Sequence, residues 1–452
     1  MVISKIKKAL ESFYLIPAVF VLAVLGRVFN VINITLPLFA FIVVLILFFC
    51  DDVKNVLAII FYAPFYIKDL NMFNMPTLYA ILIASVVVAL LYFTIKRIIT
   101  LKRQNALIKG KLYIPLAIVT VAYLLGGVVY DFNLTNAMVI LVLSMATFLL
   151  YFIALNSEKD VGTFMCKVFV IGAILVGFMV LYENYVNYGG IRYIFSRSYY
   201  SWVGAENVNV AALFILLGVF GAFSLGYKTK KDGIWLLVSV LFYLLIIVTY
   251  CRMVIGVGAV SLILLTILTL KNSPDRKRFL IYLASIIPIG IIAIILSWNV
   301  ISQILSVLFN KMSFGLTGRE ELWPWCIEKF RQNPIFGIGF KISENVPTMG
   351  AGAAHYVLAH NVLLQWLTSL GIFGTLCMTV FTVFKYKILL KDFSSQGLII
   401  RLLIIFIAVN SLIDQAPQMD PFIYNIVIVL IAWIERISFH CEKIKVTKNE
   451  KN

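Results

Sequence analysis

The run VNVAALFILLGVFGAFSLG, residues 208–226, decides the fold class because no charged side chain interrupts it. Its length matches the roughly 20 apolar residues that a transmembrane helix needs. Hydrophobic residues make up 62% and charged residues 13% of the 452-residue chain, whereas soluble domains have about 45–50% and about 25%. A chain this long and this apolar cannot hide its surface in one water-soluble core. The sequence therefore predicts an all-α, polytopic membrane protein.

Similar runs recur along the chain, and we predict about fourteen transmembrane helices. They lie near residues 12–29, 34–50, 53–70, 75–95, 112–130, 135–155, 162–184, 208–226, 233–250, 252–270, 279–297, 356–384, 397–415 and 420–438. If two of the first three are re-entrant or interfacial, the total is twelve. This division gives about eleven spans in residues 1–297, a large extracytoplasmic loop at 298–355, about three spans in 356–438 and a cytoplasmic tail at 439–452.

The charge distribution predicts the orientation. The net charge is +17, and most Lys and Arg residues fall in segments that are cytoplasmic if the N-terminus is cytoplasmic, as the positive-inside rule requires. Both termini are then cytoplasmic. Because the positive charges lie between apolar runs, we attribute the net charge to membrane topology. We therefore expect a lipid bilayer, and no nucleic acid, as a partner. The opposite face is rich in arginine, whose planar guanidinium grips phosphate with two hydrogen bonds. We therefore expect an anionic ligand on that face; the alternative is that the excess of arginine arises by chance.

Sequence motifs exclude several classes of enzyme. The chain has six scattered cysteines and no CxxC pair, P-loop, HExxH or GxSxG motif, so we expect buried thiols, no metal site and no cofactor. Some membrane glycosyltransferases use acidic residues in the first external loop. The corresponding segment here, residues 28–34, contains no Asp or Glu, which argues against that class.

The long loop contains a predicted amphipathic helix at residues 320–332, with Leu322, Cys326 and Phe330 four residues apart. Asn333-Pro334 ends this helix, and the glycine-containing run that follows predicts a flexible, tight turn. We expect the helix to lie across the outer membrane surface over a cavity. The alternative is an interfacial helix that only packs.

Two residues near the outer ends of spans are candidate catalytic groups. His360 opens a span, can titrate near neutral pH and could serve as a general base. The polar stripe Asn361, Gln365 and Thr368 follows it and suggests a helix that lines a cavity. Arg252 lies between two apolar runs, where an arginine is costly unless it meets water, an anion or a carboxylate. Snorkelling toward the interface is the alternative for Arg252.

An aromatic segment near residues 182–202 is a candidate substrate-binding loop. It interleaves Arg192 and Arg197 with aromatic residues that include Tyr199, Tyr200 and Trp202. Flat aromatic faces beside polar groups suit sugar rings or a lipid phosphate. An aromatic belt at the membrane interface is the alternative.

The motifs together resemble the O-antigen ligase and polymerase superfamily, the Wzy-type enzymes. The resemblance lies in TGREELW at 317–323, Phe330, NPIFGIG at 333–339, His360-Asn361 and LGIFG at 370–374, with Arg252 upstream. Cys251 precedes this arginine, where the family commonly has serine. The resembling part covers about 130 residues.

The resemblance implies a GT-C-like, metal-independent, inverting glycosyltransferase in the bacterial inner membrane. Its donor would be a glycan on undecaprenyl pyrophosphate, its acceptor another glycan, and a flippase and a chain-length regulator could be partners. His360 would act as the base, with Asn361 contacting substrate, while Arg319 and Arg252 would hold the pyrophosphate. Arg192 and Arg197 are added from the aromatic loop and not from the family. We interpret the chain as a repeat-unit polymerase for a surface polysaccharide or exopolysaccharide; the alternatives are a ligase that transfers finished glycan to a terminal acceptor, and a polysaccharide transporter or lipid flippase.

Overall fold

The protein is an assembly of helices with two small strand pairs, as a computed structural model shows. The structure describes residues 2–29, 31–66, 77–130, 132, 134–157, 160–188, 202–203, 206–229, 231–273, 275–296, 319–342, 355–356, 359–390, 395–412 and 421–449. The helices of the first half are α1 (Val2–Glu11), α2 (Leu15–Val28), α3 (Ile32–Phe49), α4 (Lys54–Phe61), η1 (Ala63–Tyr66), α5 (Thr77–Arg103), α6 (Tyr113–Leu125), α7 (Leu134–Leu155) and α8 (Val161–Tyr188).

The second half continues this pattern, with the strands at its beginning and in the long loop. Its helices are α9 (Val208–Thr229), α10 (Asp232–Val248), α11 (Arg252–Asn272), α12 (Arg276–Leu296), α14 (Arg319–Gln332), α15 (Val362–Leu389), α16 (Ser395–Ser411) and α18 (Pro421–Asn449). Strand β1 (Trp202–Val203) pairs antiparallel with β2 (Glu206–Asn207), and β3 (Lys341–Ile342) pairs antiparallel with β4 (His355–Tyr356).

The predicted polytopic helical fold is confirmed, although the spans differ in detail. Within the described residues, seven helices are long and apolar enough to cross a membrane, or eight if α1 and α2 form one bent span, and four shorter apolar helices accompany them. The span predicted at 53–70 is not a single helix in the described residues. α4 has only eight residues, about 12 Å, and a four-residue 3₁₀ turn follows it.

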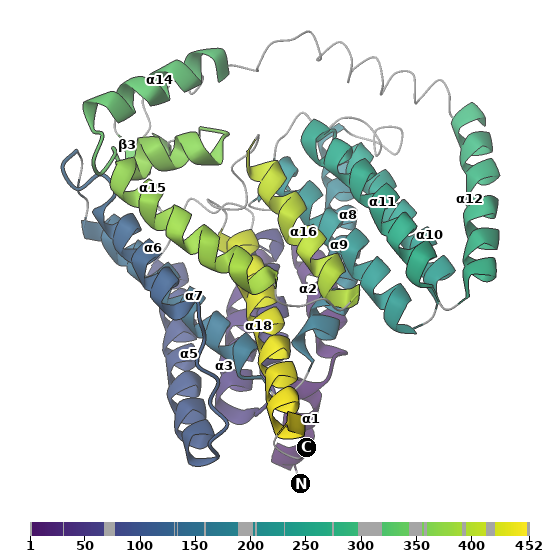
Figure 1. Cartoon of the computed structure of the whole chain (residues 1–452), viewed down its shortest axis with the longest axis horizontal. Coiled ribbons are helices and arrows are strands. Elements are labelled where there is room, and N and C mark those ends of the chain that lie inside the picture. Colours follow the sequence, from purple (N-terminus) through teal and green to yellow (C-terminus); the bar gives the residue numbers. More distant parts are fainter. Residues whose placement is uncertain are drawn as a thin grey trace.

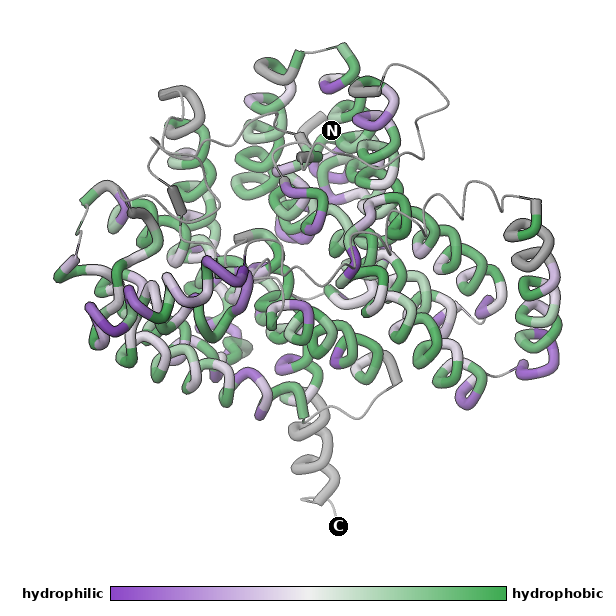
Figure 2. Tube along the Cα trace, turned by 90° about the horizontal axis from the view of Figure 1, so that it is seen from above, coloured by the Kyte–Doolittle hydropathy of each residue, from purple (hydrophilic) through white to green (hydrophobic). Residues whose placement is uncertain are grey.

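α14 and the two chain ends lie at opposite ends of the molecule (Figure 1). Figure 1 shows α14 lying across the top of the bundle, whereas both termini lie at the bottom. In Figure 2 the long helices are coloured mainly as hydrophobic, whereas α14 carries many hydrophilic residues. The apolar helices therefore form a layer whose upper face carries α14.

The run at 208–226 forms the core helix. Every residue of α9 from Val210 to Gly226 is buried, as expected for a helix that is hydrophobic on all sides. A Cβ on Gly218 would lie 2.3 Å from the Cβ of Ala173, and one on Gly221 would lie 2.6 Å from the carbonyl oxygen of Cys166. These two glycines therefore allow α9 to approach α8 closely, as small residues do between membrane helices.

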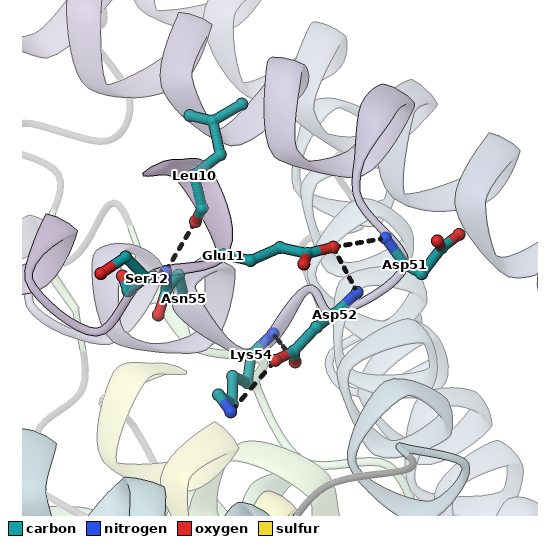
Figure 3. Close-up of polar contacts among 7 residues, drawn as sticks. All are labelled: Leu10, Glu11, Ser12, Asp51, Asp52, Lys54 and Asn55. Atoms are coloured by element: carbon teal, nitrogen blue, oxygen red, sulfur yellow. Dashed lines mark hydrogen bonds and ion pairs between the residues drawn. The ribbon is translucent and has the colours of Figure 1, made fainter. Parts of the chain in front are cut away.

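A polar cluster fixes the bend of 75° between α1 and α2. The carboxylate of Glu11 accepts hydrogen bonds from the backbone N–H groups of Asp51 and Asp52, at 3.2 and 3.4 Å. The Asn55 amide donates to the backbone oxygens of Leu10 and Ser12, at 2.7 and 2.9 Å (Figure 3). The turn after α1 and the turn before α4 are therefore joined, and α1 runs at a steep angle to α2.

A second polar contact lies among the apolar helices. Arg27 on α2 donates through Nε to Oε1 of Glu183 on α8 at 2.9 Å, and its Nη2 contacts the same oxygen. The two side chains are 13% and 11% exposed. This ion pair joins α2 to α8. Charged groups in a membrane protein are costly unless they are paired, so removing either partner alone would leave the other as an unpaired charge.

Candidate functional site on the α14 and α15 face

The short helix predicted in the long loop is confirmed as α14, which begins at Arg319. Glu320 and Glu321 lie in its first turn, and Lys329 and Arg331 lie in its last turn. Each pair has the sign that the helix dipole favours at that end. Arg319 is therefore held at the beginning of a helix whose ends are electrostatically stabilised.

α14 rests on a small apolar cluster. Leu322 and Cys326 are buried against Ile338 and Ala359, and Trp325 packs at the edge. Leu322 and Cys326 lie four residues apart, so the predicted helical face is the one that is buried. α14 therefore packs on protein along this face.

The same burial affects the chemistry of the Cys326 thiol. Burial raises the pKa of Cys326 to about 11, because a low-dielectric environment disfavours the thiolate. The thiol is thus protonated at neutral pH and is a poor nucleophile. The prediction that this cysteine acts as a small buried hydrophobic residue agrees with this environment.

α15 is broken at Gly371, which differs from the continuous span predicted at 356–384. Gly371 has φ 64° and ψ −165°, a conformation that is essentially restricted to glycine. The break divides α15 into a first arm, residues 362–370, and a second arm, residues 372–389. Figure 1 shows the two arms of α15 running in different directions, with the first arm beneath α14.

Residues 333–340, which we call the strap, satisfy the backbone groups that the break exposes. The strap donates from Ile338 N to Thr368 O at 2.9 Å and from Gly339 N to Ser369 O at 3.0 Å, at the end of the first arm. At the start of the second arm, Ile372 N donates to Pro334 O at 2.8 Å and Phe373 N donates to Ile335 O at 3.1 Å.

These four bonds replace helix bonds that a continuous α15 would make. The two glycine-containing motifs, 333–339 and 370–374, are therefore two halves of one structural unit. The tight turn predicted in the glycine-containing run is present, and its backbone is hydrogen-bonded to α15; its flexibility stays a prediction.

The strap also reaches α6. Gly127, directly after α6, donates from its backbone N–H to Phe336 O at 2.9 Å. A Cβ on Gly127, whose φ is 72°, would lie 2.6 Å from Gly339 N. The rings of Tyr123 and Phe340 meet edge to face with their centroids 5.4 Å apart. The strap is therefore held between α6 and α15.

His360 lies in a turn just before the first arm. Its φ is 48°, which is uncommon for a residue other than glycine. The residue before it, Ala359, donates its N–H to Oε1 of Gln365 at 2.8 Å and accepts from Trp323 Nε1 at 2.9 Å. His360 is thus presented from a backbone that α14 and α15 both hold.

Asn361 caps the first arm and connects it to α16. Its Oδ1 accepts from Leu364 N at 3.0 Å, and its Nδ2 donates to Leu412 O at 3.0 Å. Both ends of the amide therefore contact protein, and contact with substrate stays a prediction.

The rest of the polar stripe is packed in the interior. Gln365 is 2% exposed and Thr368 is 0% exposed. The Thr368 hydroxyl bonds to Leu364 O at 2.8 Å and to Cys326 O at 3.3 Å. Thr368 therefore joins α15 to α14, and the interpretation of the stripe as a cavity lining does not hold for these two buried residues.

Arg252 is the first residue of α11, on the other side of α16 from α15. It is exposed and follows a tight turn in which Tyr250 has φ 54°. Cys251 N donates to the Thr249 hydroxyl at 3.3 Å in this turn. α16 packs against α11, and Leu412, the residue after α16, accepts the Asn361 hydrogen bond, so α16 and its C-terminal end connect the regions of Arg252 and His360.

The predicted aromatic loop lies largely outside the described residues. Arg192, Arg197, Tyr199 and Tyr200 are not described, and Trp202 is described only as a backbone position of β1, paired with Asn207. Their roles stay predictions. Among the described residues, no group of three or more His, Cys, Asp or Glu side chains could hold a metal ion.

The structure places two further side chains, Trp323 and Gln365, against Ala359, the residue before His360, and the sequence analysis gave neither this role. Trp323 was quoted only as part of a motif, but its position four residues after Arg319 places both on one helical face. Gln365 was interpreted as part of a cavity lining. The spacing of both residues can be seen in the sequence, but their shared contact with Ala359 is seen only in the structure.

Residues 236–379 match a protein family described as O-antigen ligase. This segment is therefore similar to the O-antigen ligase family. The match covers less than half of the chain and extends from α10 into the second arm of α15. It includes Arg252, α14, the strap and His360. Similarity to this family supports the interpretation of the protein as a membrane enzyme of glycan assembly. No curated protein matches the chain.

Proposed function

We propose that the protein polymerises oligosaccharide repeat units carried on undecaprenyl pyrophosphate. The observation that carries the proposal is the common support of Arg319 and His360. α14 begins at Arg319, and its Trp323 side chain bonds to the residue before His360. A candidate anion-binding group and a candidate base are thus supported by the same hydrogen-bonded unit in the segment that matches the family.

The proposed reaction is a single displacement at the anomeric carbon of the donor sugar. His360 accepts the proton of the acceptor hydroxyl as its oxygen forms the new glycosidic bond. The bond between the anomeric carbon and the pyrophosphate oxygen breaks, and undecaprenyl pyrophosphate leaves with the negative charge. Arg319 and Arg252 stabilise that developing charge, so the proposed mechanism is metal-independent and inverts the anomeric configuration.

The proposal includes the orientation in the membrane. We place the α14 face on the outside and both termini in the cytoplasm of a bacterial inner membrane. The predicted charge asymmetry supports this placement, and so do the basic residues in the last turns of α5, α9 and α11. The donor lipid would then approach from the outer leaflet, where a flippase would deliver it and a chain-length regulator could act on the product.

A ligase is the second candidate, because the matching family is described as O-antigen ligase. The two activities use the same donor chemistry and differ in the acceptor. Purified protein in liposomes with a lipid-linked repeat unit separates them. A ladder of chain lengths indicates a polymerase, whereas transfer of one preformed glycan only when a terminal acceptor is added indicates a ligase.

His360→Ala and His360→Asn test the mechanism in the same assay. Asn tolerates positive φ better than Ala, so it keeps the turn while removing the base. We expect both variants to lose about 10²–10⁴ in rate, with membrane insertion intact. His355→Ala, in β4, is the matched control and should be much milder. Wild-type rates in either His360 variant would contradict the catalytic assignment.

A further inference from the structure

The residue before His360 is held by side chains from two helices. The Ala359 carbonyl oxygen accepts a hydrogen bond from the indole N–H of Trp323 on α14, at 2.9 Å. The Ala359 N–H donates to the side-chain oxygen of Gln365 on α15, at 2.8 Å. Ala359 is fully buried. Both polar atoms of its backbone are therefore occupied.

We propose that Trp323 and Gln365 are positioning residues that hold His360 and Arg319 in fixed relation for glycan transfer. The inference rests on the proposed function, because it assigns these two residues a role through His360. Neither side chain needs to touch substrate. Their effect comes from fixing the backbone that presents the histidine.

Trp323 connects the two proposed reacting groups. It lies four residues after Arg319, so both are on the same face of α14. Its hydrogen bond to Ala359 fixes α14 against the turn that contains His360. If this bond is lost, the apolar contacts of Leu322 and Cys326 and the hydrogen bond from Thr368 to the Cys326 carbonyl still hold α14, but none of them is a hydrogen bond to Ala359.

Gln365 holds the N–H group of Ala359, whereas Trp323 holds its carbonyl oxygen. Its Nε2 donates to the Ser369 hydroxyl at 2.7 Å, which leaves Oε1 to face the Ala359 N–H. Flipping the amide would place its NH₂ group against that N–H, so the hydrogen-bond network assigns one orientation. The side chain is 2% exposed, so water cannot replace the lost bonds easily.

Asn361 anchors the turn at a third point, through Leu412, the residue after α16. The residues on either side of His360 are therefore bonded to α14, to α15 and to the end of α16. Displacements of about 1 Å can cost a reaction on the order of 10²-fold in rate, so loosening one anchor should reduce turnover without unfolding the protein.

The first test compares Trp323→Phe with Trp325→Phe in the liposome assay. Both changes keep an aromatic ring, but only Trp323 donates to Ala359. We expect Trp323→Phe to lower turnover about 10- to 100-fold, while Trp325→Phe stays within about twofold and both variants keep similar thermal stability. Equal turnover in the two variants would overturn the proposal for Trp323.

A double-mutant comparison distinguishes positioning from a general structural role. If Trp323 acts through His360, then Trp323→Phe should cause no further loss in a His360→Asn background. A purely structural defect would lower the residual rate in both backgrounds by the same factor, and that additive result would overturn the proposal.

The role of Gln365 can be tested by comparing a substitution that keeps its hydrogen bonds with one that removes them. A neutral Glu at this position can accept from the Ala359 N–H and donate to the Ser369 hydroxyl, whereas Met can do neither. Gln365→Glu should therefore retain more activity than Gln365→Met, and more as the pH falls. Equal loss at every pH would overturn this assignment.

The wild-type arm separates failure of the inference from failure of the proposed function. Absence of transfer by the wild-type protein from the lipid-linked donor would reject the proposed function, and the positioning role with it. Active wild type together with identical Trp323 and Trp325 variants would reject the positioning role of Trp323 alone.

Discussion

Replacing Gly371 with alanine should destabilise the protein strongly, because the helix break depends on glycine. Alanine at φ 64° and ψ −165° would carry strain of about 1–3 kcal/mol. Its Cβ would lie 2.3 Å from the backbone oxygen of Ile335, so the strap must move. Losing the bonds at Pro334 and Ile335 costs a further 0.5–1.5 kcal/mol each, approximately. We expect a total of about 2–6 kcal/mol.

The control is Gly256→Ala in α11, where a new Cβ would meet nothing within 4 Å. Alanine is favoured over glycine in a helix by roughly 0.5–1 kcal/mol, so this variant should be as stable as wild type or slightly more stable. Thermal unfolding in detergent, followed by the loss of monodisperse protein, measures both. If Gly371→Ala unfolds at the same temperature as Gly256→Ala, the strap does not stabilise the break.

Three further predictions address charge and topology. Arg319→Lys should lose most transfer activity despite keeping the charge, because one ammonium cannot reproduce a bidentate grip on pyrophosphate. Wild-type turnover in this variant would mean that Arg319 contributes only a positive charge. Arg27→Met should cost about 3–5 kcal/mol in thermal unfolding, because it leaves Glu183 charged and buried, and adding Glu183→Gln should recover much of the loss; an equally unstable double variant would contradict this. Glu328→Cys should react with an impermeant maleimide in intact cells, because this position is exposed on α14, whereas labelling only after permeabilisation would reverse the proposed orientation.

The sequence predicted the long helices well because hydropathy reports burial in lipid directly. The run at 208–226 became α9, and the periodic spacing of Leu322 and Cys326 located the buried face of α14. The third span was predicted wrongly, because residues 53–70 are apolar but the helix ends at Phe61. Apolar composition does not distinguish a full crossing from a short buried helix.

The break in α15 could not be predicted from the sequence because its cause is distant along the chain. Gly371 and the strap lie more than thirty residues apart, and each taken alone resembles an ordinary glycine in a helix or a loop. The candidate site residues His360 and Arg319 were singled out by residue type and motif, and their roles are proposals. Their support by Trp323 and Gln365 depends on contacts with Ala359, a residue with no distinguishing chemistry of its own.

The shortness of α6 has a consequence for the surrounding lipid. Its 13 residues span about 20 Å, whereas the hydrocarbon core of a bilayer is roughly 30 Å thick. The chain then turns at Gly127, which is buried and bonds to the strap, so the apolar helix does not continue beyond Leu125 on this side of the protein. Hydrophobic mismatch of this kind thins the adjacent leaflet. If the donor is a lipid pyrophosphate, as proposed, it would have a shorter vertical distance to travel beside α6 than beside the longer helices α5 and α7.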